Sequence, residues 1–331
     1  MSYELLVEVT RNDAIESRHF GSAVVCDFQG NVVKSWGDVE GLIFPRSAIK
    51  PMLAIQLIES GASDHFSLTD TELSLACSSH HGESIHQIPV KSWLKRIGLD
   101  ESQLACGAVL PDDIESAQKM LASGERPGKI HHTCSGKHTG YLTTALHLSL
   151  PIDGYQLLEH PLQQSSLALI SDMAGVDLKQ YPIGIDGCGF PATTLPLRNL
   201  GIAAARFANP IGLSVSRVSA INRIKHAMTS QPLCLAGHET FVSDIAEVTK
   251  GAVLAKTGAE GVIIAVLSKQ GLGVAVKIAD GNDRASPVAL MAILECLGVL
   301  SEQEKQQLQS YALPKLLNSR AEIVGEIRSA I

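Results

Sequence analysis

Strand patterns lie at both ends of this 331-residue sequence, and helical patterns fill its middle. This order limits the folds that the chain can adopt, because strands that are far apart in sequence must then pair with one another. The expected strands, rich in Val, Ile and Leu, cover residues 5–9, 22–27, 32–36, 252–256, 261–266 and 272–278. Residues 47–230 carry mainly helical signals, and helices at about 284–297 and 301–311 are expected to close the chain.

This arrangement predicts a mixed α/β (α+β) fold in which N- and C-terminal strands form one antiparallel sheet beside a helical lobe. We find no internal repeat or linker, so residues 1–331 are expected to form a single unit. Its sheet lobe would combine residues 1–46 with 250–331, and its mainly helical lobe would cover 47–249. A cleft between the lobes is the expected place for a functional site.

Composition excludes several classes of protein. Charged residues make up 18% of the chain and the net charge is −7, without a basic stripe, so a nucleic-acid partner is not expected. No run approaches the roughly 18 apolar residues of a membrane span, and the first ten residues lack the pattern of an export signal. Seven cysteines without a C-x-x-C pair favour a reducing compartment. We therefore expect a cytoplasmic protein.

The segment Phe44–Pro51 carries the sharpest chemical signal. Proline is tolerated only in the first turn of a helix, so Pro51 ahead of an apolar run places a helix start near Ser47. Residues three apart share a helix face, which brings Lys50 within reach of the Ser47 hydroxyl. A lysine that loses its proton there could activate the serine as a nucleophile.

The same Ser-x-x-Lys spacing at Ser92/Lys95 and Ser116/Lys119 is typical of solvated helix faces, so the spacing alone is weak. The motif Lys256-Thr257-Gly258, at the end of an expected strand, strengthens the interpretation of Ser47 and Lys50 as a catalytic pair. Ser-x-x-Lys followed by Lys-Thr-Gly is the pattern of class A β-lactamases and penicillin-binding proteins.

The polar segment Cys77–Glu83 follows a helix whose capping box is Thr69 and Glu72. It could place a second hydroxyl opposite Ser47. For His80 and His81, we expect solvated side chains in a capped turn. The segment also departs from the Ser-Asp-Asn motif of β-lactamases.

Two further segments, 131–140 and 184–191, contain Cys134 and Cys188 among glycines. Spacing alone favours buried, inert cysteines, because a structural zinc site usually has four clustered Cys or His ligands. A nucleotide-binding loop is excluded, because the Gly-x-x-x-x-Gly-Lys-Ser/Thr spacing is missing.

In their order, these segments resemble the thermolabile, rhizobial-type L-asparaginase II family. The resemblance spans nearly the whole chain and rests on motifs at 45–51, 77–83, 134–138, 184–189 and 277–285. It implies a serine β-lactamase-like fold, a homodimer, and hydrolysis of L-asparagine to L-aspartate and ammonia. It also implies two facing Ser/Lys pairs, namely Ser47 with Lys50 and Ser79 with Lys256, and Ser47 is the expected nucleophile.

The resemblance further implies a zinc ion bound by Cys134, Cys188 and Lys137. Binding a free amino acid requires a cation for its carboxylate and an acid for its ammonium group, and Arg46, Asp186 and Glu83 lie in suitable segments. The alternatives are a glutaminase or β-lactamase-like serine acyl hydrolase on the same fold, and a non-catalytic amino-acid sensor.

Overall fold

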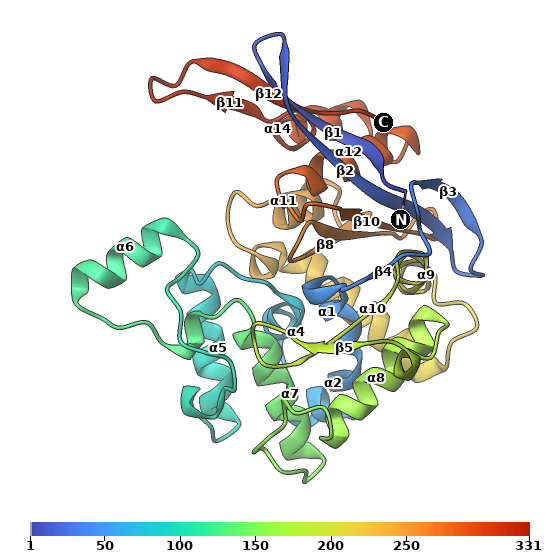
Figure 1. The fold of residues 1–331 in the computed structure, drawn as a ribbon. Helices are drawn as coiled ribbons and strands as arrows, with labels where there is room; N and C mark the ends of the chain where they lie inside the picture. The colour runs from blue at the N-terminus through green and yellow to red at the C-terminus, as the bar shows by residue number, and fades with distance from the viewer. Residues whose placement is uncertain (1) are drawn as a thin grey trace.

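The computed structural model describes residues 2–331, and the strands of both chain ends form one antiparallel sheet. The strand order is β11-β12-β1-β2-β10-β9-β8, with β3 also pairing with β2 (Figure 1). The strands are β1 (Glu4–Arg11), β2 (Ala14–Asp27), β3 (Val32–Trp36), β8 (Val253–Gly258), β9 (Val262–Leu267), β10 (Leu272–Ile278), β11 (Lys315–Leu317) and β12 (Ile323–Ser329). The expected strands and their pairing are therefore confirmed.

The C-terminus departs from the expectation that helices close the chain. The predicted helix 301–311 divides into α13 (Glu302–Gln307) and α14 (Gln309–Ala312), and β11 and β12 follow it. These two strands lie at the sheet edge, with β12 paired to β1 through Val7 and Ser329. Their apolar alternation is short, because Ile323 is largely exposed and Gly325 has no side chain. The sequence pattern is consequently too weak to reveal them.

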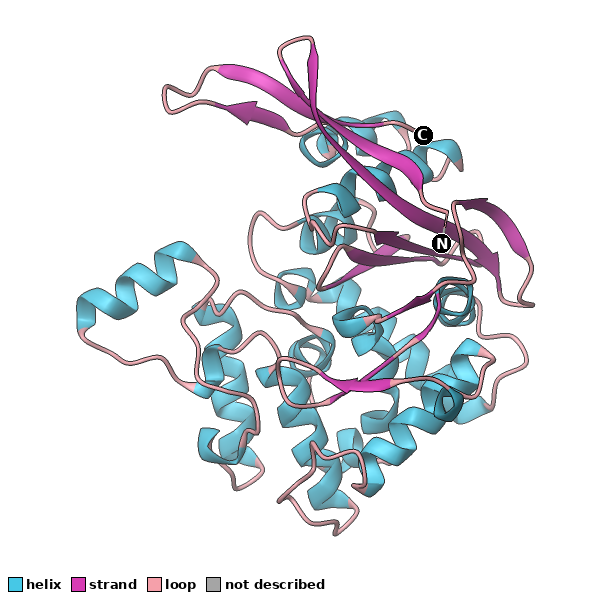
Figure 2. Ribbon diagram, in the orientation of Figure 1, coloured by secondary structure: helices cyan, strands magenta, loops and turns pink. Residues whose placement is uncertain are grey.

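Helices cover both faces of the sheet. On one face, α11 (Phe241–Val248) and α12 (Ala285–Cys296) share a hydrophobic core with β1, β2 and β8–β10. On the other face, α9 (Leu197–Ala208) packs across β2, β9 and β10 and joins the core of the helical lobe. Figure 2 shows the resulting layers, with the helical lobe below the sheet.

The close packing of α9 on β10 depends on Gly273. A Cβ atom at this position would lie 2.1 Å from the backbone nitrogen of Ala205 and 2.4 Å from the backbone oxygen of Gly201. Gly273→Ala is therefore expected to lower the free energy of unfolding by about 1–3 kcal/mol, because backbone must move to admit the methyl group. Urea unfolding measures the change. Gly107→Ala is the matched control, since nothing lies within 4 Å of its Cβ position, and an equal loss there would contradict the explanation.

The helical lobe is built from short helices and two small hairpins. Its main helices are α1 (Lys50–Leu53), α2 (Ile55–Glu59), α3 (Ala62–His65), α4 (Asp70–Cys77), α5 (Ser84–Arg96), α6 (Ile114–Ser123), α7 (Ser135–His147), α8 (Pro161–Ala174) and α10 (Val215–Ser230). The hairpins pair β4 (Leu42–Ile43) with β7 (Leu195–Pro196), and β5 (Ile183–Ile185) with β6 (Pro191–Thr193).

Local capping explains where two of these helices begin. Thr69 and Glu72 form the predicted capping box of α4. Helix α8 begins at Pro161, because His160 caps it and proline occupies its first turn. Within residues 2–331, no helix combines the length and apolar character needed to cross a membrane.

Candidate active site

Ser47 lies in a tight turn between the sheet and the helical lobe. The turn is the 3₁₀ helix η1 (Arg46–Ile49), which leads directly into α1, and Pro51 occupies the first turn of α1 as expected. Arg46 has a positive φ of 51°, a conformation that side chains other than glycine rarely adopt. Gly258 of β8 packs so closely against this turn that a Cβ atom at position 258 would lie 2.3 Å from the Pro45 oxygen. The edge of the sheet thus fixes the position of Ser47.

Ser79 lies between two buried lysines. Its Oγ accepts hydrogen bonds from Lys50 Nζ at 3.0 Å and from Lys256 Nζ at 2.8 Å. Lys50 also donates to the Ser78 carbonyl, and Lys256 donates to the Thr257 carbonyl. The Ser79–Lys256 pair therefore forms as expected. Among the described residues, no hydrogen bond links Ser47 to Lys50, which differs from the expected pair. Lys50 instead donates to Ser79, and it lines the same cavity as Ser47.

The backbone around Ser79 is held from two sides. The amides of Ser79 and His81 donate to Leu235 and Ala236, and the His80 amide donates to Thr133. His80 is buried rather than solvated, which corrects the sequence expectation. Its Nε2 lies 2.8 Å from Ser135 Oγ, and its Nδ1 accepts the Gly82 amide hydrogen. Burial and the neighbouring His86 hold the pKa of His80 well below its ordinary value, so the ring is a neutral structural group.

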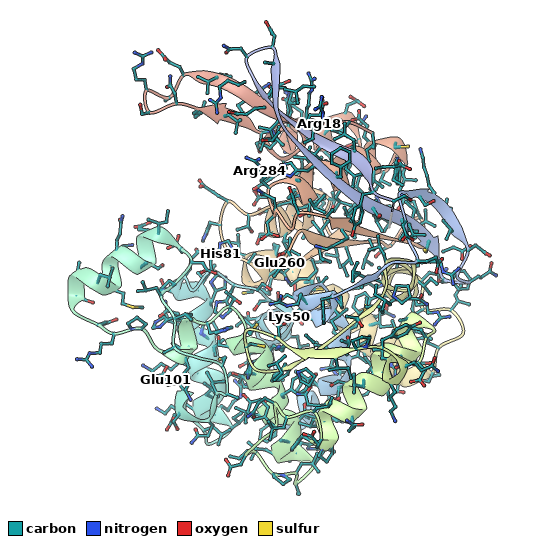
Figure 3. All side chains as sticks on the ribbon, in the orientation of Figure 1. Arg18, Lys50, His81, Glu101, Glu260 and Arg284 are labelled. Atoms are coloured by element: carbon teal, nitrogen blue, oxygen red, sulfur yellow. The ribbon has the colours of Figure 1, made fainter. Side chains whose placement is uncertain are left out.

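Lys256 is a buried lysine whose pKa is lowered. It is 1% exposed, and burial followed by repulsion from Lys50 holds its pKa well below the ordinary value of a lysine. A buried amine without its proton can accept one from an adjacent hydroxyl. The Ser79 hydroxyl is the group within hydrogen-bond distance. In Figure 3, Lys50 lies where the sheet lobe and the helical lobe meet.

Cys134, Lys137 and Cys188 come together in the interior. Lys137 Nζ lies 3.0 Å from Cys188 Sγ and 3.8 Å from the centre of the Phe190 ring. A hydrogen bond from Cys188 lowers the pKa of Cys134, and this effect outweighs burial, which would raise the pKa. The lowered pKa favours the thiolate form of Cys134. Burial lowers the pKa of Lys137, but attraction to the two sulfurs outweighs it and raises the pKa overall.

This donor set fits a zinc ion, because two sulfurs and one amine converge in a buried site and thiolates are strong zinc ligands. Zinc binding would require Lys137 to lose its proton. In the described part of the chain, no cluster of three or more His, Cys, Asp or Glu side chains offers another metal site.

Arg46 and Asp186 form an ion pair at the mouth of the site. Arg46 donates from Nε and Nη2 to Asp186 Oδ1 at 3.1 and 2.7 Å. The Gly187 amide also donates to Oδ1. Within residues 2–331, neither Arg46 Nη1 nor Asp186 Oδ2 has a hydrogen-bond partner, so each is free to bind a ligand. Glu83 lies elsewhere, where it pairs with His238.

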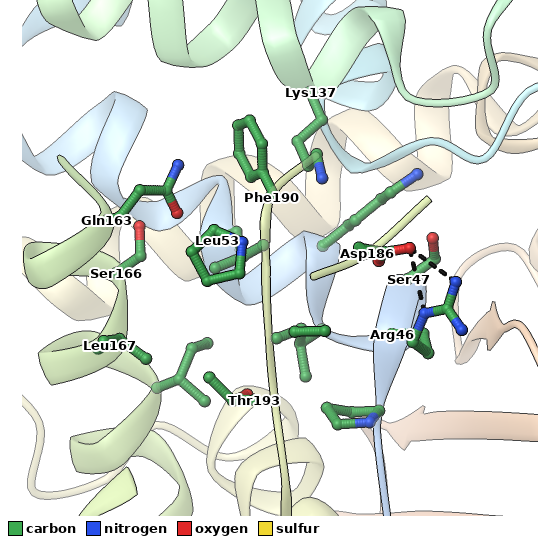
Figure 4. A pocket seen from close by; sticks show the side chains of 16 residues that line it. Arg46, Ser47, Leu53, Lys137, Gln163, Ser166, Leu167, Asp186, Phe190 and Thr193 are labelled. Carbon is green, nitrogen blue, oxygen red and sulfur yellow. Dashed lines mark hydrogen bonds and ion pairs between the residues drawn. The ribbon is translucent and has the colours of Figure 1, made fainter. Parts of the chain in front are cut away.

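These groups surround a small cavity of about 40 Å³ that reaches from the ion pair into the helical lobe. Figure 4 shows Arg46, Ser47 and Asp186 at one end, and Gln163, Ser166, Leu167 and Thr193 at the other. Lys50 and Lys137 also line the cavity. Sequence reasoning missed the residues at the inner end. Gln163 and Ser166 belong to an ordinary helical pattern, and Thr193 follows the recognised 184–191 segment without a signal of its own.

The chain resembles several solved structures at low sequence identity. A structure of Mglu in its native form is 12% identical with a TM-score of 0.46, and the match covers 84% of this chain. The chain spans 61% of that protein's length. A β-lactamase from Mycobacterium bovis is 14% identical with a TM-score of 0.42, covering 83% of this chain and 94% of the other. A putative β-lactamase from Bacteroides dorei is 15% identical with a TM-score of 0.45, covering 83% and 92%.

No curated protein matched the sequence. A family model described as L-asparaginase II matches residues 7–329, which is nearly the whole chain. The match includes every segment that contributes to the site. The chain therefore belongs to the L-asparaginase II family.

Proposed function

We propose that this protein hydrolyses the side-chain amide of L-asparagine to L-aspartate and ammonia, with Ser47 as the nucleophile. The observation that carries the proposal is the Ser79 hydroxyl held between Lys50 and Lys256 beside the cavity that Ser47 lines. Ser79 and Lys256 do not line that cavity. This difference supports Ser47 as the residue that meets substrate, and Ser79 as part of the proton relay.

The chemistry proceeds in two steps. Ser47 Oγ attacks the side-chain amide carbon while its proton passes to the relay formed by Lys50, Ser79 and Lys256. The carbon–nitrogen bond then breaks, and the nitrogen leaves as ammonia after receiving a proton. Water next attacks the aspartyl ester, which releases L-aspartate and restores the Ser47 hydroxyl. The lowered pKa of Lys256 supports its role as the final proton acceptor in the first step.

The ion pair at the mouth suits a free amino acid. The unpaired Nη1 of Arg46 would bind the α-carboxylate, and the unpaired Oδ2 of Asp186 would bind the α-ammonium group. Contact of Glu83 with substrate stays a prediction. Its carboxylate already pairs with His238 and does not line the cavity.

Cys134, Lys137 and Cys188 would hold a zinc ion in this proposal, and such an ion would supply a Lewis acid beside the substrate. Cys188→Ser is expected to lower the zinc content of the purified protein by at least about half, because a hydroxyl replaces a sulfur ligand. Elemental analysis measures the content. Cys26→Ser is the control, since Cys26 is buried beneath α9, away from this site; unchanged zinc in Cys188→Ser would mean that the cysteine only packs.

The decisive experiment measures ammonia release from L-asparagine and L-glutamine, together with hydrolysis of a chromogenic β-lactam, with enzyme limiting. We expect L-asparagine to be turned over fastest. Preference for glutamine or for the β-lactam would replace the proposal with one of the alternative acyl hydrolases. Binding of asparagine without any turnover would favour the amino-acid sensor. Assembly as a homodimer and a cytoplasmic location stay predictions, and sedimentation analysis tests the first of them.

A further inference from the structure

His138 lies on the same helix face as two of the three candidate zinc donors. Cys134 directly precedes α7, and Lys137 and His138 follow it by three and four positions, which is the spacing of neighbours on one face of a helix. The His138 amide donates to the Cys134 carbonyl at 3.0 Å. Cys188 reaches this face from the loop between β5 and β6, where its Sγ lies 3.0 Å from Lys137 Nζ. His138 is therefore a neighbour of the donor set.

One ring nitrogen of His138 is buried without a partner. The side chain is fully buried, and its Nε2 has no hydrogen-bond partner within residues 2–331. The other nitrogen, Nδ1, lies 2.6 Å from the Tyr155 hydroxyl. A buried polar atom left unpaired costs free energy, and native structures rarely keep one without a reason. The unpaired Nε2 therefore points to a ligand that comes from outside the chain.

The hydrogen bonds of Tyr155 show that Nε2 is a donor. The Tyr155 hydroxyl oxygen accepts the Ala105 amide hydrogen at 2.9 Å. Its own hydrogen has one acceptor among residues 2–331, which is Nδ1 of His138. If Nδ1 accepts, the ring hydrogen must be on Nε2. A nitrogen that carries a hydrogen cannot bind a metal ion, so His138 is suited to donate to a ligand of the metal rather than to the metal itself.

Phe190 fixes the His138 ring beside the metal donors. The centres of the two rings are 4.4 Å apart, and Lys137 Nζ lies 3.8 Å from the centre of the same Phe190 ring. Figure 4 shows Lys137 next to Phe190 at the edge of the cavity. Phe190 also follows Cys188 by two residues. The His138 ring is thus held between Phe190 and Tyr155, and it cannot turn to find another acceptor without losing both contacts.

We infer that His138 is a positioning residue, whose Nε2–H group donates a hydrogen bond to the oxygen atom that completes the zinc coordination. The inference rests on the zinc site of the proposed function. Zinc in an active site usually takes three protein ligands and leaves a fourth position to water or substrate, and Cys134, Lys137 and Cys188 are the three donors here. The hydrogen bond from His138 would hold and orient the oxygen at that fourth position.

The test measures zinc affinity by competition with a chromophoric chelator. His138→Phe removes the donor but keeps a ring of similar size, and it should weaken zinc binding about tenfold or more. His138→Gln retains an N–H donor and should recover most of the affinity. His86→Phe is the matched control, because His86 is also fully buried but both of its ring nitrogens are already paired, with the Glu83 amide and the Leu233 carbonyl. Its zinc affinity should equal that of the wild type.

Cobalt(II) in place of zinc supplies a second readout. Its visible absorption bands report the ligands of the ion, so they should shift in His138→Phe and stay unchanged in His86→Phe. A role in folding alone would lower the unfolding temperature of His138→Phe without shifting these bands, which would overturn the inference. If His138→Phe does not fold, Tyr155→Phe decides, because it removes the hydroxyl that keeps the hydrogen on Nε2. Unchanged zinc affinity in Tyr155→Phe would then overturn the inference.

The possible failures are distinguishable. Equal zinc affinity in the wild type and in His138→Phe overturns this inference and leaves the zinc site intact. Equal losses in His138→Phe and His86→Phe would show that the histidines act only through packing, which overturns it as well. A wild-type protein that binds no zinc overturns the zinc site and the inference together. Ammonia release from L-asparagine by the same preparation then shows whether the proposed hydrolysis survives.

Discussion

Ser47→Ala is expected to lower kcat for L-asparagine on the order of 10⁴-fold or more, because the variant lacks the atom that forms the covalent bond. The fold should survive. Ser47 is only half-buried, and its hydroxyl makes no hydrogen bond within residues 2–331. Steady-state ammonia release gives the rate, and mass spectrometry of acid-quenched samples detects the aspartyl ester.

Ser79→Ala is the informative comparison. This variant removes the shared acceptor of Lys50 and Lys256 but leaves the Ser47 hydroxyl in the cavity. We expect a slower reaction in which the ester still forms on Ser47. An ester on Ser79 in the Ser47→Ala variant, with activity close to wild type, would instead make Ser79 the nucleophile.

Lys256→Met is expected to abolish the acid limb of the pH–activity profile along with most of the activity. In the wild-type protein, activity should fall as the pH drops through the lowered pKa of Lys256, because the protonated amine can no longer accept a proton from Ser79. The pH dependence of kcat/KM, measured in the wild-type protein and in the variant with its residual activity, tests this role.

The same variant should be more stable than the wild type at neutral pH. Below the ordinary lysine pKa of 10.5, the unfolded chain binds a proton that the folded chain lacks. Wild-type stability therefore rises with pH between the lowered pKa and 10.5, and the advantage of the variant shrinks over this range. Lys225→Met is the matched comparison: burial also lowers the pKa of Lys225, so this variant should share the gain in stability, but it should keep its activity because Lys225 lies outside the site. A less stable, fully active Lys256→Met variant would contradict both roles.

Local patterns were sufficient to predict the central strands and the start of α1. Pro51 positions that helix through a restriction on its own backbone, and the strands at 253–278 are nearly continuous buried runs rich in Val and Ile, which can be recognised singly. The edge strands β11 and β12 were missed because pairing with β1, rather than their own apolar content, determines them. The buried state of His80 likewise depends on Ser135, which is distant in sequence.

The site was predictable as a set of residues but not as a set of contacts. The family resemblance implied that Ser47, Lys50, Ser79 and Lys256 lie together, and the structure brings three of them, Lys50, Ser79 and Lys256, into one hydrogen-bonded group. The sequence could not indicate that Lys50 would choose Ser79 over Ser47. That choice depends on where α4 ends, because the Ser78 carbonyl, a second acceptor for Lys50, directly follows this helix.

The Ser79 hydroxyl takes one lysine from each half of the molecule, since Lys50 begins α1 and Lys256 belongs to β8. Proton transfer through the Ser79 hydroxyl consequently requires that the two halves of the molecule stay packed against each other. Displacing one half by about an ångström would break this contact, and the hydrophobic core that spans both halves resists such a displacement. Activity in mild denaturant should therefore be lost together with this shared core, so that catalysis reports on the packing between the halves.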